Sequence, residues 1–279
     1  MRANNLTISI PYIGCDKNPR CPYCVSGCTG YLKANPSLML RNFPKVLNLA
    51  TISQVSSVLL TGKGEPCLNM DCVLDYTWKF KEFPVELQTN GIWLRHNLSM
   101  VQELSETGMN VIAVSVDTLR TGYEELAEAI HEAGMLLRIS FNIINDEYLR
   151  RENQSGVIVP FNDILYTARV WGADQLTLRQ IVAPNHTTET TQSKWIKENC
   201  VPSVYSRLRD EMIGMCHLRG HHLRSLPYGA EVYDLQGMSV SYSNYCIQDD
   251  NKGDDIRSLI FQEDGGLYTS WNSSASRLF

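Results

Sequence analysis

The stretch LTISIPYIGCDKNPRCPYCVSGC, residues 6–28, joins a strand-like run to a cysteine-rich loop. Residues 6–13 are mostly apolar or β-branched, which predicts a strand. The loop that follows holds four of the nine cysteines of the chain, namely Cys15, Cys21, Cys24 and Cys28. Thiols gathered in a loop at the end of a strand form either a metal or cluster site or a redox pair. The rest of the chain must decide between these possibilities.

The chain beyond this loop alternates strand and helix signals. Further apolar or β-branched runs predict strands at 55–60, 84–88, 110–116, 136–144 and 174–182. Helical spacing predicts helices at 70–80, 94–107, 123–133 and 163–171. This alternation is typical of an α/β fold with a parallel sheet and right-handed crossovers. Six such units are too few for a closed eight-stranded barrel. We therefore expect a partial, TIM-like (β/α)6 barrel.

The pattern changes after residue 184. Helices are expected at 187–199 and 203–215, followed by two hairpins with turns at Gln236-Gly237 and Asp264-Gly265. We expect residues 1–184 to form the partial barrel. Residues 185–279 are expected to form a short α+β extension that closes the barrel mouth, with 272–279 as a frayed tail.

Polar residues stand where each predicted strand ends. In parallel α/β folds the carboxyl ends of the strands share one rim, and sites form there. The cysteine loop ends the first strand. The other strands end in the segment 61–66 (TGKGEP), the segment 89–91 (TNG), Ser115 with Asp117, Asn142, and Arg179 with Gln180. The sequence therefore predicts a single site at this rim.

Composition narrows the class of protein. A net charge of −5 over 279 residues argues against bulk nucleic-acid binding, which needs a basic surface. The amino-terminal residues show no apolar signal region, and no uncharged run approaches the roughly 18 residues that cross a bilayer. An odd number of unevenly spaced cysteines in a chain of this size suits a reducing compartment. We therefore expect a cytoplasmic protein without membrane contacts.

Three interpretations of the cysteine loop compete. Cys21-Pro-Tyr-Cys24 alone is a dithiol motif, but a redox pair would leave Cys15 and the other strand ends unexplained. The four cysteines together have enough thiolates for a structural zinc ion, although zinc sites more often use two C-x2-C arms and only one is present. In the third interpretation, three thiolates hold a 4Fe–4S cluster and leave one iron open for a ligand.

The third interpretation is supported by a resemblance to the radical S-adenosylmethionine (radical SAM) superfamily. Cys15, Cys21 and Cys24, with Tyr23 before the last cysteine, resemble its cluster motif. Its later motifs are matched by 63–66 (KGEP, for Gly-Gly-Glu-Pro), 88–91 (QTNG), 115–117 (SVD) and 138–142 (RISFN), the last being similar to the molybdenum-cofactor first-step synthase subgroup. The resemblance spans residues 5–182. The cysteine spacing is C-x5-C-x2-C instead of the usual C-x3-C-x2-C, and Lys63 replaces the first glycine.

The resemblance implies a cofactor set and a chemistry. Cys15, Cys21 and Cys24 would hold the 4Fe–4S cluster. S-adenosylmethionine would contact Tyr23, Gly62, Gly64, Glu65, Thr89, Asn90, Ser115, Asp117, Arg138, Asn142 and Arg179. One electron from a flavodoxin- or ferredoxin-type donor would cleave its S–C5′ bond, and the 5′-deoxyadenosyl radical would abstract hydrogen from the substrate. No residue is assigned as catalytic.

Individual roles within this set differ. Gly62 and Gly64 would let backbone approach the ligand, and main-chain groups at Glu65 would meet the methionine ammonium. Arg138 is expected to pair with the carboxylate of the cofactor, and Arg179 to contact a ligand. Asp117 would either bond a ribose hydroxyl or cap the following helix.

The substrate is expected to be a small molecule or a free nucleotide, given the acidic charge and the short extension. Alternatives are the modification of a nucleic-acid base or a peptide, or a non-catalytic zinc or iron–sulfur binding module.

Cys28 is interpreted as a loop or early-helix residue. Cys200, Cys216 and Cys246 are expected to be packing residues or free thiols, with an auxiliary cluster as the alternative. The His-rich run 217–222 is expected to be a solvated loop, with phosphate or carboxylate binding as the alternative.

Overall fold

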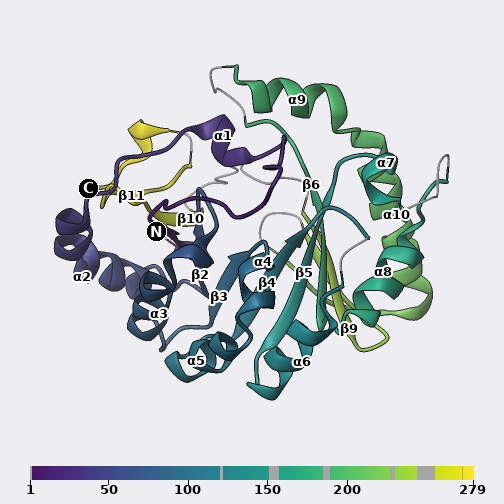
Figure 1. Ribbon diagram of the computed structural model, residues 1–279, viewed down its shortest axis with the longest axis horizontal. Helices are drawn as coiled ribbons and strands as arrows, with labels where there is room; N and C mark the ends of the chain where they lie inside the picture. Colours follow the sequence, from purple (N-terminus) through teal and green to yellow (C-terminus); the bar gives the residue numbers. More distant parts are fainter. Residues whose placement is uncertain are drawn as a thin grey trace.

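The computed structural model describes residues 2–119, 122–150, 157–184, 189–226, 230–243, 255–271 and 273–279. Within them, one eleven-stranded sheet forms the centre of the molecule, in the order β11-β10-β1-β2-β3-β4-β5-β6-β9-β8-β7 (Figure 1). The six predicted strands are present as β1 (Arg2–Ile10), β2 (Val58–Gly62), β3 (Val85–Thr89), β4 (Val111–Val116), β5 (Leu136–Ile143) and β6 (Gln175–Gln180). They run parallel, as predicted for a partial barrel.

Helices cover the outer face of this sheet (Figure 1). They are α2 (Pro36–Ile52), α3 (Met70–Lys79), α4 (Ile92–His96), α5 (Ser99–Thr107), α6 (Glu124–Glu132), α7 (Asp146–Leu149) and α8 (Phe161–Val170). The helix expected at 94–107 is divided into α4 and α5, because Asn97 leaves helical geometry and its side-chain amide donates to the carbonyl of Trp93 at 2.8 Å. The 17-residue α2 was not predicted; its N-cap is Asn35, whose side chain accepts a hydrogen bond from Leu38 N.

The carboxyl-terminal third extends the sheet at both ends. It contains α9 (Thr191–Asn199), α10 (Pro202–Arg219), β7 (His221–Ser225), β8 (Glu231–Leu235), β9 (Met238–Ser243), β10 (Asp255–Phe261) and β11 (Leu267–Tyr268). Both predicted hairpins are confirmed, as β8–β9 and β10–β11. However, β9 also pairs in parallel with β6, and β10 pairs in parallel with β1. Eight neighbouring strands, from β10 through β1–β6 to β9, are therefore parallel. The division of the chain at residue 184 stays a prediction.

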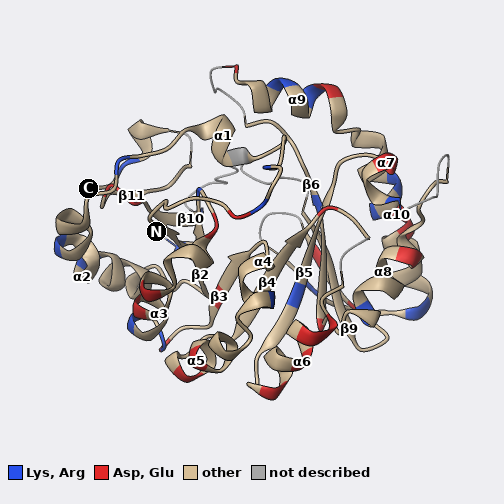
Figure 2. Ribbon diagram, in the orientation of Figure 1, with Lys and Arg blue, Asp and Glu red and all other residues tan. Residues whose placement is uncertain are grey.

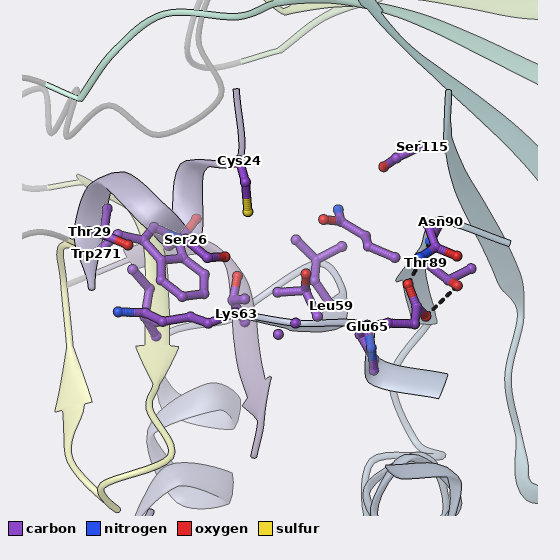
Figure 3. A pocket seen from close by; sticks show the side chains of 18 of the residues that line it. Cys24, Ser26, Thr29, Leu59, Lys63, Glu65, Thr89, Asn90, Ser115 and Trp271 are labelled. Carbon is purple, nitrogen blue, oxygen red and sulfur yellow. Dashed lines mark hydrogen bonds between the residues drawn. The ribbon is translucent and has the colours of Figure 1, made fainter. Parts of the chain in front are cut away.

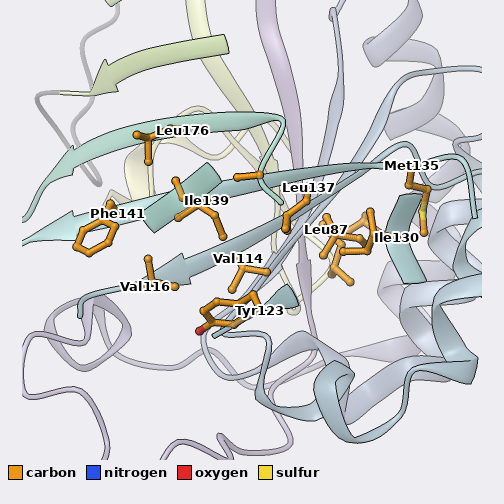
Figure 4. Close-up of a cluster of buried hydrophobic side chains, with 14 of the residues drawn as sticks. Leu87, Val114, Val116, Tyr123, Ile130, Met135, Leu137, Ile139, Phe141 and Leu176 are labelled. Atoms are coloured by element: carbon orange, nitrogen blue, oxygen red, sulfur yellow. The ribbon is translucent and has the colours of Figure 1, made fainter. Parts of the chain in front are cut away.

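The two faces of the parallel strands differ in polarity. On β1, for example, Leu6, Ile8 and Ile10 are fully buried against the helices, whereas Asn5 and Thr7 line the inner cavity. Side chains alternate between faces along a strand, so this pattern recurs from strand to strand. The apolar outward set packs with the helices into the main core, which includes Leu87, Val114, Val116, Leu137, Ile139 and Leu176 (Figure 4). The inner face is thus polar, although these strands were predicted as apolar or β-branched runs.

Two expectations about the carboxyl-terminal third are wrong. The last residues are not frayed: Leu278 N donates to Leu267 O at 2.7 Å, and Phe279 packs against the main core. The His-rich run is not a loop, because His221 and His222 lie in the exposed edge strand β7. No helix among the described residues is long and apolar enough to cross a bilayer. Acidic and basic residues both occur along the outer helices (Figure 2).

Candidate functional site

A cavity of about 390 Å³ opens at the carboxyl ends of the parallel strands and reaches inward between them (Figure 3). Ten of the fourteen residues predicted for the site line it: Cys15, Cys21, Cys24, Gly62, Gly64, Glu65, Thr89, Asn90, Ser115 and Arg179. These residues come from the loop after β1 and from the ends of β2, β3, β4 and β6. The shared rim expected from the sequence is therefore present.

The cysteine loop separates its four thiols. Cys15, Cys21 and Cys24 line the cavity, and helix α1 (Val25–Thr29) begins directly after Cys24. Cys28, in α1, is only 5% exposed and does not line the cavity; it packs with Tyr23, Ile144 and other apolar residues in a small core, against which Cys21 also packs. Burial raises the pKa of the Cys15 thiol above its ordinary value. Cys15, Cys21 and Cys24 therefore stay the predicted ligands, and Cys28 is the one thiol of the loop that does not line the cavity.

The three cavity-facing thiols do not converge on one point. No group of three or more His, Cys, Asp or Glu side chains in the described ranges is arranged to hold a single metal ion. A 4Fe–4S cluster needs a wider arrangement than a single ion, because each of its thiolates binds a different iron. The arrangement of Cys15, Cys21 and Cys24 around one cavity fits such a cluster.

Glu65 braces two of the loops at the rim. Its Oε1 accepts hydrogen bonds from Thr89 Oγ1 at 2.5 Å and Cys67 N at 3.1 Å, and its Oε2 accepts from Asn90 N at 2.8 Å (Figure 3). Burial raises the pKa of Glu65, even though these three donors favour its charged form. The carboxylate therefore ties the end of β2 to the end of β3, and both of its oxygens already have protein partners.

Gly64 is required by contact between two loops. A Cβ at this position would lie 2.1 Å from the carbonyl oxygen of Gly14 and 2.8 Å from the ring of Tyr12. The carbonyl oxygen of Gly14 also accepts a hydrogen bond from the next residue, Glu65, whose backbone N lies 2.9 Å away. We expected Gly64 to make room for a ligand; its missing side chain instead lets the 61–66 loop approach the cysteine loop.

Tyr23 and Asp117 lie behind the cavity wall. The Tyr23 hydroxyl donates to the Asp117 carboxylate, and Lys17 Nζ lies 2.9 Å from the same carboxylate. Neither Tyr23 nor Asp117 lines the cavity. Burial, reinforced by Asp117, raises the pKa of Tyr23 well above its ordinary value. Asp117 accepts from both of these groups of the cysteine loop, and it does not cap α6, whose N-cap is Tyr123. It therefore anchors the cysteine loop to the end of β4.

Arg138 does not lie at the rim. Its guanidinium pairs with the carboxylate of Glu86, and its Nε donates to Gln175 Oε1 at 2.7 Å. The residue is the third of β5, near the amino end of the strand, and it is not part of the cavity wall. The expected contact between Arg138 and a cofactor carboxylate is therefore wrong, because the side chain is engaged at the opposite end of the barrel.

Asn142 and Arg179 are neighbours at the carboxyl ends of β5 and β6, where their Cα atoms are in register. Arg179 lines the cavity and forms no ion pair with the described residues. Asn142 is 8% exposed, and its Oδ1 has no hydrogen-bond partner within the same residues. A buried oxygen without a donor is unfavourable. Arg179 thus offers a cation to the cavity, whereas Asn142 lies beside it as a buried acceptor and does not line the cavity.

Several cavity residues were not predicted. On the early strands they are Asn5, Thr7 and Leu59. Thr61, Lys63 and Gln88 also line the cavity; they belong to the predicted rim and motif segments but were given no role of their own. The alternation of Asn5, Thr7 and Ser9 with apolar residues was a usable signal for the first strand. The carboxyl-terminal third contributes Ser243, Arg257, Ser258, Ile260, Thr269 and Trp271, and nothing local in the sequence connects them to the rim.

The remaining cysteines lie apart from each other. Cys200 packs beside the small core around Tyr23 and Cys28, whereas Cys216 belongs to the main core. Burial raises the pKa of Cys200 to about 12 and that of Cys216 to about 11. Cys246 lies outside the described residues. Cys200 and Cys216 thus occupy separate packing environments.

Comparison with known proteins gives a partial match in sequence. No protein-family model matches the chain. The chain is 31% identical over 107 residues to the GTP 3′,8-cyclase of Clostridium acetobutylicum. This match covers 37% of this chain and 32% of the cyclase, so the chain matches about a third of the length of this relative.

Comparison of folds covers nearly the whole chain. SuiB of Streptococcus suis bound to its precursor peptide SuiA superposes with a TM-score of 0.59 at 15% identity, over 96% of this chain and 59% of SuiB. The same protein bound to S-adenosylmethionine gives a TM-score of 0.59 at 15% identity, over 96% and 60%. At this identity the likeness establishes the fold, a largely parallel α/β sheet of the partial TIM-barrel type.

Proposed function

We propose that this chain is a member of the radical SAM superfamily. As such it would be an enzyme that reductively cleaves S-adenosylmethionine and uses the resulting radical to abstract hydrogen from a small-molecule or nucleotide substrate. The ordered motifs and the match to the cyclase over 107 residues support this membership, and the fold is compatible with it. The activity, the substrate class and a flavodoxin- or ferredoxin-type electron donor are parts of the proposal. The observation that carries it is the trio of cysteines facing a cavity with Glu65, Asn90, Ser115 and Arg179.

Cys15, Cys21 and Cys24 would hold the 4Fe–4S cluster. When bound, the cluster supplies the electron that breaks the S–C5′ bond of the cofactor. Cys28 is turned into a core, so the loop offers three ligands and leaves a fourth position for S-adenosylmethionine. The ion pair of Lys17 with Asp117 and the hydrogen bond from Tyr23 to Asp117 would hold the loop in this arrangement.

The methionine part of the cofactor would bind at the ends of β5 and β6. Arg179 takes the role first expected of Arg138, because its guanidinium faces the cavity and has no acidic partner in the described residues. Asn142 Oδ1 would accept a hydrogen bond from the ammonium group or a hydroxyl of the cofactor, which would satisfy a buried oxygen.

The adenosine part would lie along the ends of β2, β3 and β4. Ser115 and Asn90 present short polar groups to the cavity. The Glu65 carboxylate fixes the main chain at Asn90 and the hydroxyl of Thr89, so it would act by positioning these groups. Gly62 would bring backbone close to the cofactor.

Residues 185–279 would complete the enclosure. Ser243 on β9 and Ser258 on β10 line the same cavity as the cysteine trio. We retain the division at residue 184 on this basis, with the second part closing the mouth of the barrel. Enclosure matters for the proposed chemistry because it excludes water and competing reactions from a reactive radical.

The proposal is tested by product formation without a known substrate. Protein reconstituted with iron and sulfide under anaerobic conditions, mixed with S-adenosylmethionine and dithionite, is expected to release 5′-deoxyadenosine and methionine, measured by liquid chromatography with mass spectrometry. Cys24→Ala is expected to release neither. Cys72→Ala, a matched change on α3, is expected to behave like wild type. Colourless protein that carries one zinc and forms no product would instead support a non-catalytic module.

A further inference from the structure

The cavity has two chemically distinct sides (Figure 3). Glu65, Thr89, Asn90 and Ser115 lie together on one side. The opposite side holds Lys63 and Trp271, with Ser26 and Thr29 beside them, and Cys24 points into the space between the two sides. The proposed function uses the first side for the cofactor. It uses neither Lys63 nor Trp271.

Trp271 offers an aromatic face to the cavity. It stands three residues after β11 and lines the cavity wall. Three of the other four tryptophans have ring or cation partners: Trp171 packs on Tyr123, Trp195 on Tyr23, and Trp78 lies under the ammonium of Lys81. The fourth, Trp93, packs against the main core instead of lining the cavity. The indole of Trp271 has no such partner in the described part of the chain. An unstacked indole at a cavity wall is suited to stacking with a planar ring.

Lys63 places a buried cation on the same side. Its side chain is 5% exposed, and its Nζ donates to the carbonyl oxygen of Gly30 at 2.6 Å. It forms no ion pair with the described residues, and burial lowers its pKa despite the field of Glu263 and Asp264. An ammonium group has three donors, so one bond to Gly30 leaves capacity for an acceptor atom of a ligand. This residue is also where the sequence departs from the glycine of the superfamily motif.

We propose that Trp271 and Lys63 form the substrate subsite, and that the substrate carries a planar ring with an acceptor oxygen. The ring would stack on the indole, and a carbonyl, carboxylate or phosphate oxygen would accept a hydrogen bond from the Lys63 ammonium. Ser26, Thr29 and Thr269 add hydroxyl groups to the same cavity. This inference rests on the proposed function, since it requires the opposite side to hold S-adenosylmethionine.

This ring chemistry has two sources, nucleobases and aromatic acids, and the test separates them. Anaerobic, cluster-reconstituted protein saturated with S-adenosylmethionine is titrated by calorimetry with guanosine, GMP, 4-hydroxybenzoate and indole-3-acetate. Glucose 6-phosphate serves as an anion without a planar ring. At least one ring-bearing probe is expected to bind, and glucose 6-phosphate is not. Whether a nucleobase or an aromatic acid binds identifies the source.

Variants locate the binding. Trp271→Ala is expected to weaken the ring-bearing probe about 5- to 150-fold, the effect of losing one stacked ring, whereas Trp271→Phe keeps most of the affinity. Lys63→Met keeps the side-chain volume and is expected to weaken binding about 10-fold or more, as for a charge-assisted hydrogen bond. Trp78→Ala is the matched control, because Trp78 is 55% exposed on α3; it is expected to bind like wild type.

The outcomes distinguish this inference from the proposed function. If wild type binds S-adenosylmethionine and releases 5′-deoxyadenosine but binds no ring-bearing probe, or prefers glucose 6-phosphate, the substrate class is wrong. If Trp271→Ala and Lys63→Met both bind the probe like wild type, the location is wrong. If wild type binds no S-adenosylmethionine, the proposed function fails and the subsite falls with it.

Discussion

Cys24 and Cys28 are only four residues apart, yet their thiols lie in different surroundings. Cys24 precedes the first residue of α1 and lines the cavity, whereas Cys28 lies in the helix and is buried beside Tyr23 and Ile144. The short helix turns one thiol toward the strands' rim and the other toward α9, with which α1 is in contact. Spacing alone permitted either thiol to be a ligand.

We predict different effects of removing these two thiols. Cys24→Ala is expected to lose the cluster, because two thiolates cannot hold it in place. Cys28→Ala is expected to keep about four irons per chain and to lose only about 1 kcal/mol of stability, as for a small cavity in a core. Iron and sulfide assays with visible absorption spectra measure the first effect, and urea unfolding measures the second. Iron loss in Cys28→Ala with full iron in Cys24→Ala would show that the trio was wrongly chosen.

Motif residues could be predicted from the sequence where one strand end determined their place. Glu65, Asn90 and Ser115 reached the rim because each lies at or just after the carboxyl end of a strand whose direction is fixed by the alternating order of strands and helices. Arg138 does not reach the rim. A strand pattern predicts which face of the sheet a side chain lies on, but it predicts neither how far along the barrel the side chain lies nor which residue it pairs with. Glu86, on β3, supplies that partner, and its pairing with β5 across β4 is a tertiary contact.

The turn between β10 and β11 joins the carboxyl-terminal third to α2. Gly265 has a φ of +79°, and a Cβ there would lie 2.7 Å from Met39 N. Its carbonyl accepts a hydrogen bond from Asn42 Nδ2 at 2.7 Å. The Asp264-Gly265 turn was predicted from the sequence, but its contact with α2 was not.

This contact can be tested with two glycines that share one backbone conformation. Gly134, after α6, has a φ of +74° and nothing within 4 Å of its Cβ position. Gly134→Ala is expected to cost about 1 kcal/mol, the left-handed conformation alone. Gly265→Ala is expected to cost about 2–5 kcal/mol, because overpacking against α2 is added. Urea unfolding followed by circular dichroism measures both. Equal losses of stability in the two variants would mean that the turn does not pack tightly against α2.

Local chemistry explains which elements the sequence predicted. Both hairpins were found because glycine turns and strand patterns lie within a few residues of each other. The parallel pairings of β10 with β1 and of β9 with β6 join segments far apart in the chain, and no local signal encodes them. The long α2 was missed because only four of its residues are buried, and one of them, the polar Asn42, finds its hydrogen-bond partner at Gly265, far along the chain.

The whole molecule combines an apolar shell with a polar interior. Outward side chains of the parallel strands pack with the helices (Figure 4), while inward side chains such as Thr7, Gln88 and Arg179 surround a cavity. Arg138 and Glu86 form an ion pair between the inner faces of β5 and β3. The packing of strands against helices therefore stabilises the fold, and the inner face is left available for ligands. This agrees with the chemistry proposed at the rim.

The central claim is that three thiolates leave one metal corner for S-adenosylmethionine. Mössbauer spectroscopy of protein reconstituted with 57Fe tests it most directly. One iron of the cluster is expected to change its signal when S-adenosylmethionine is added, and Cys28→Ala is expected to respond in the same way. Four irons that are unaffected by the cofactor, with full coordination by protein sulfur, would contradict the account.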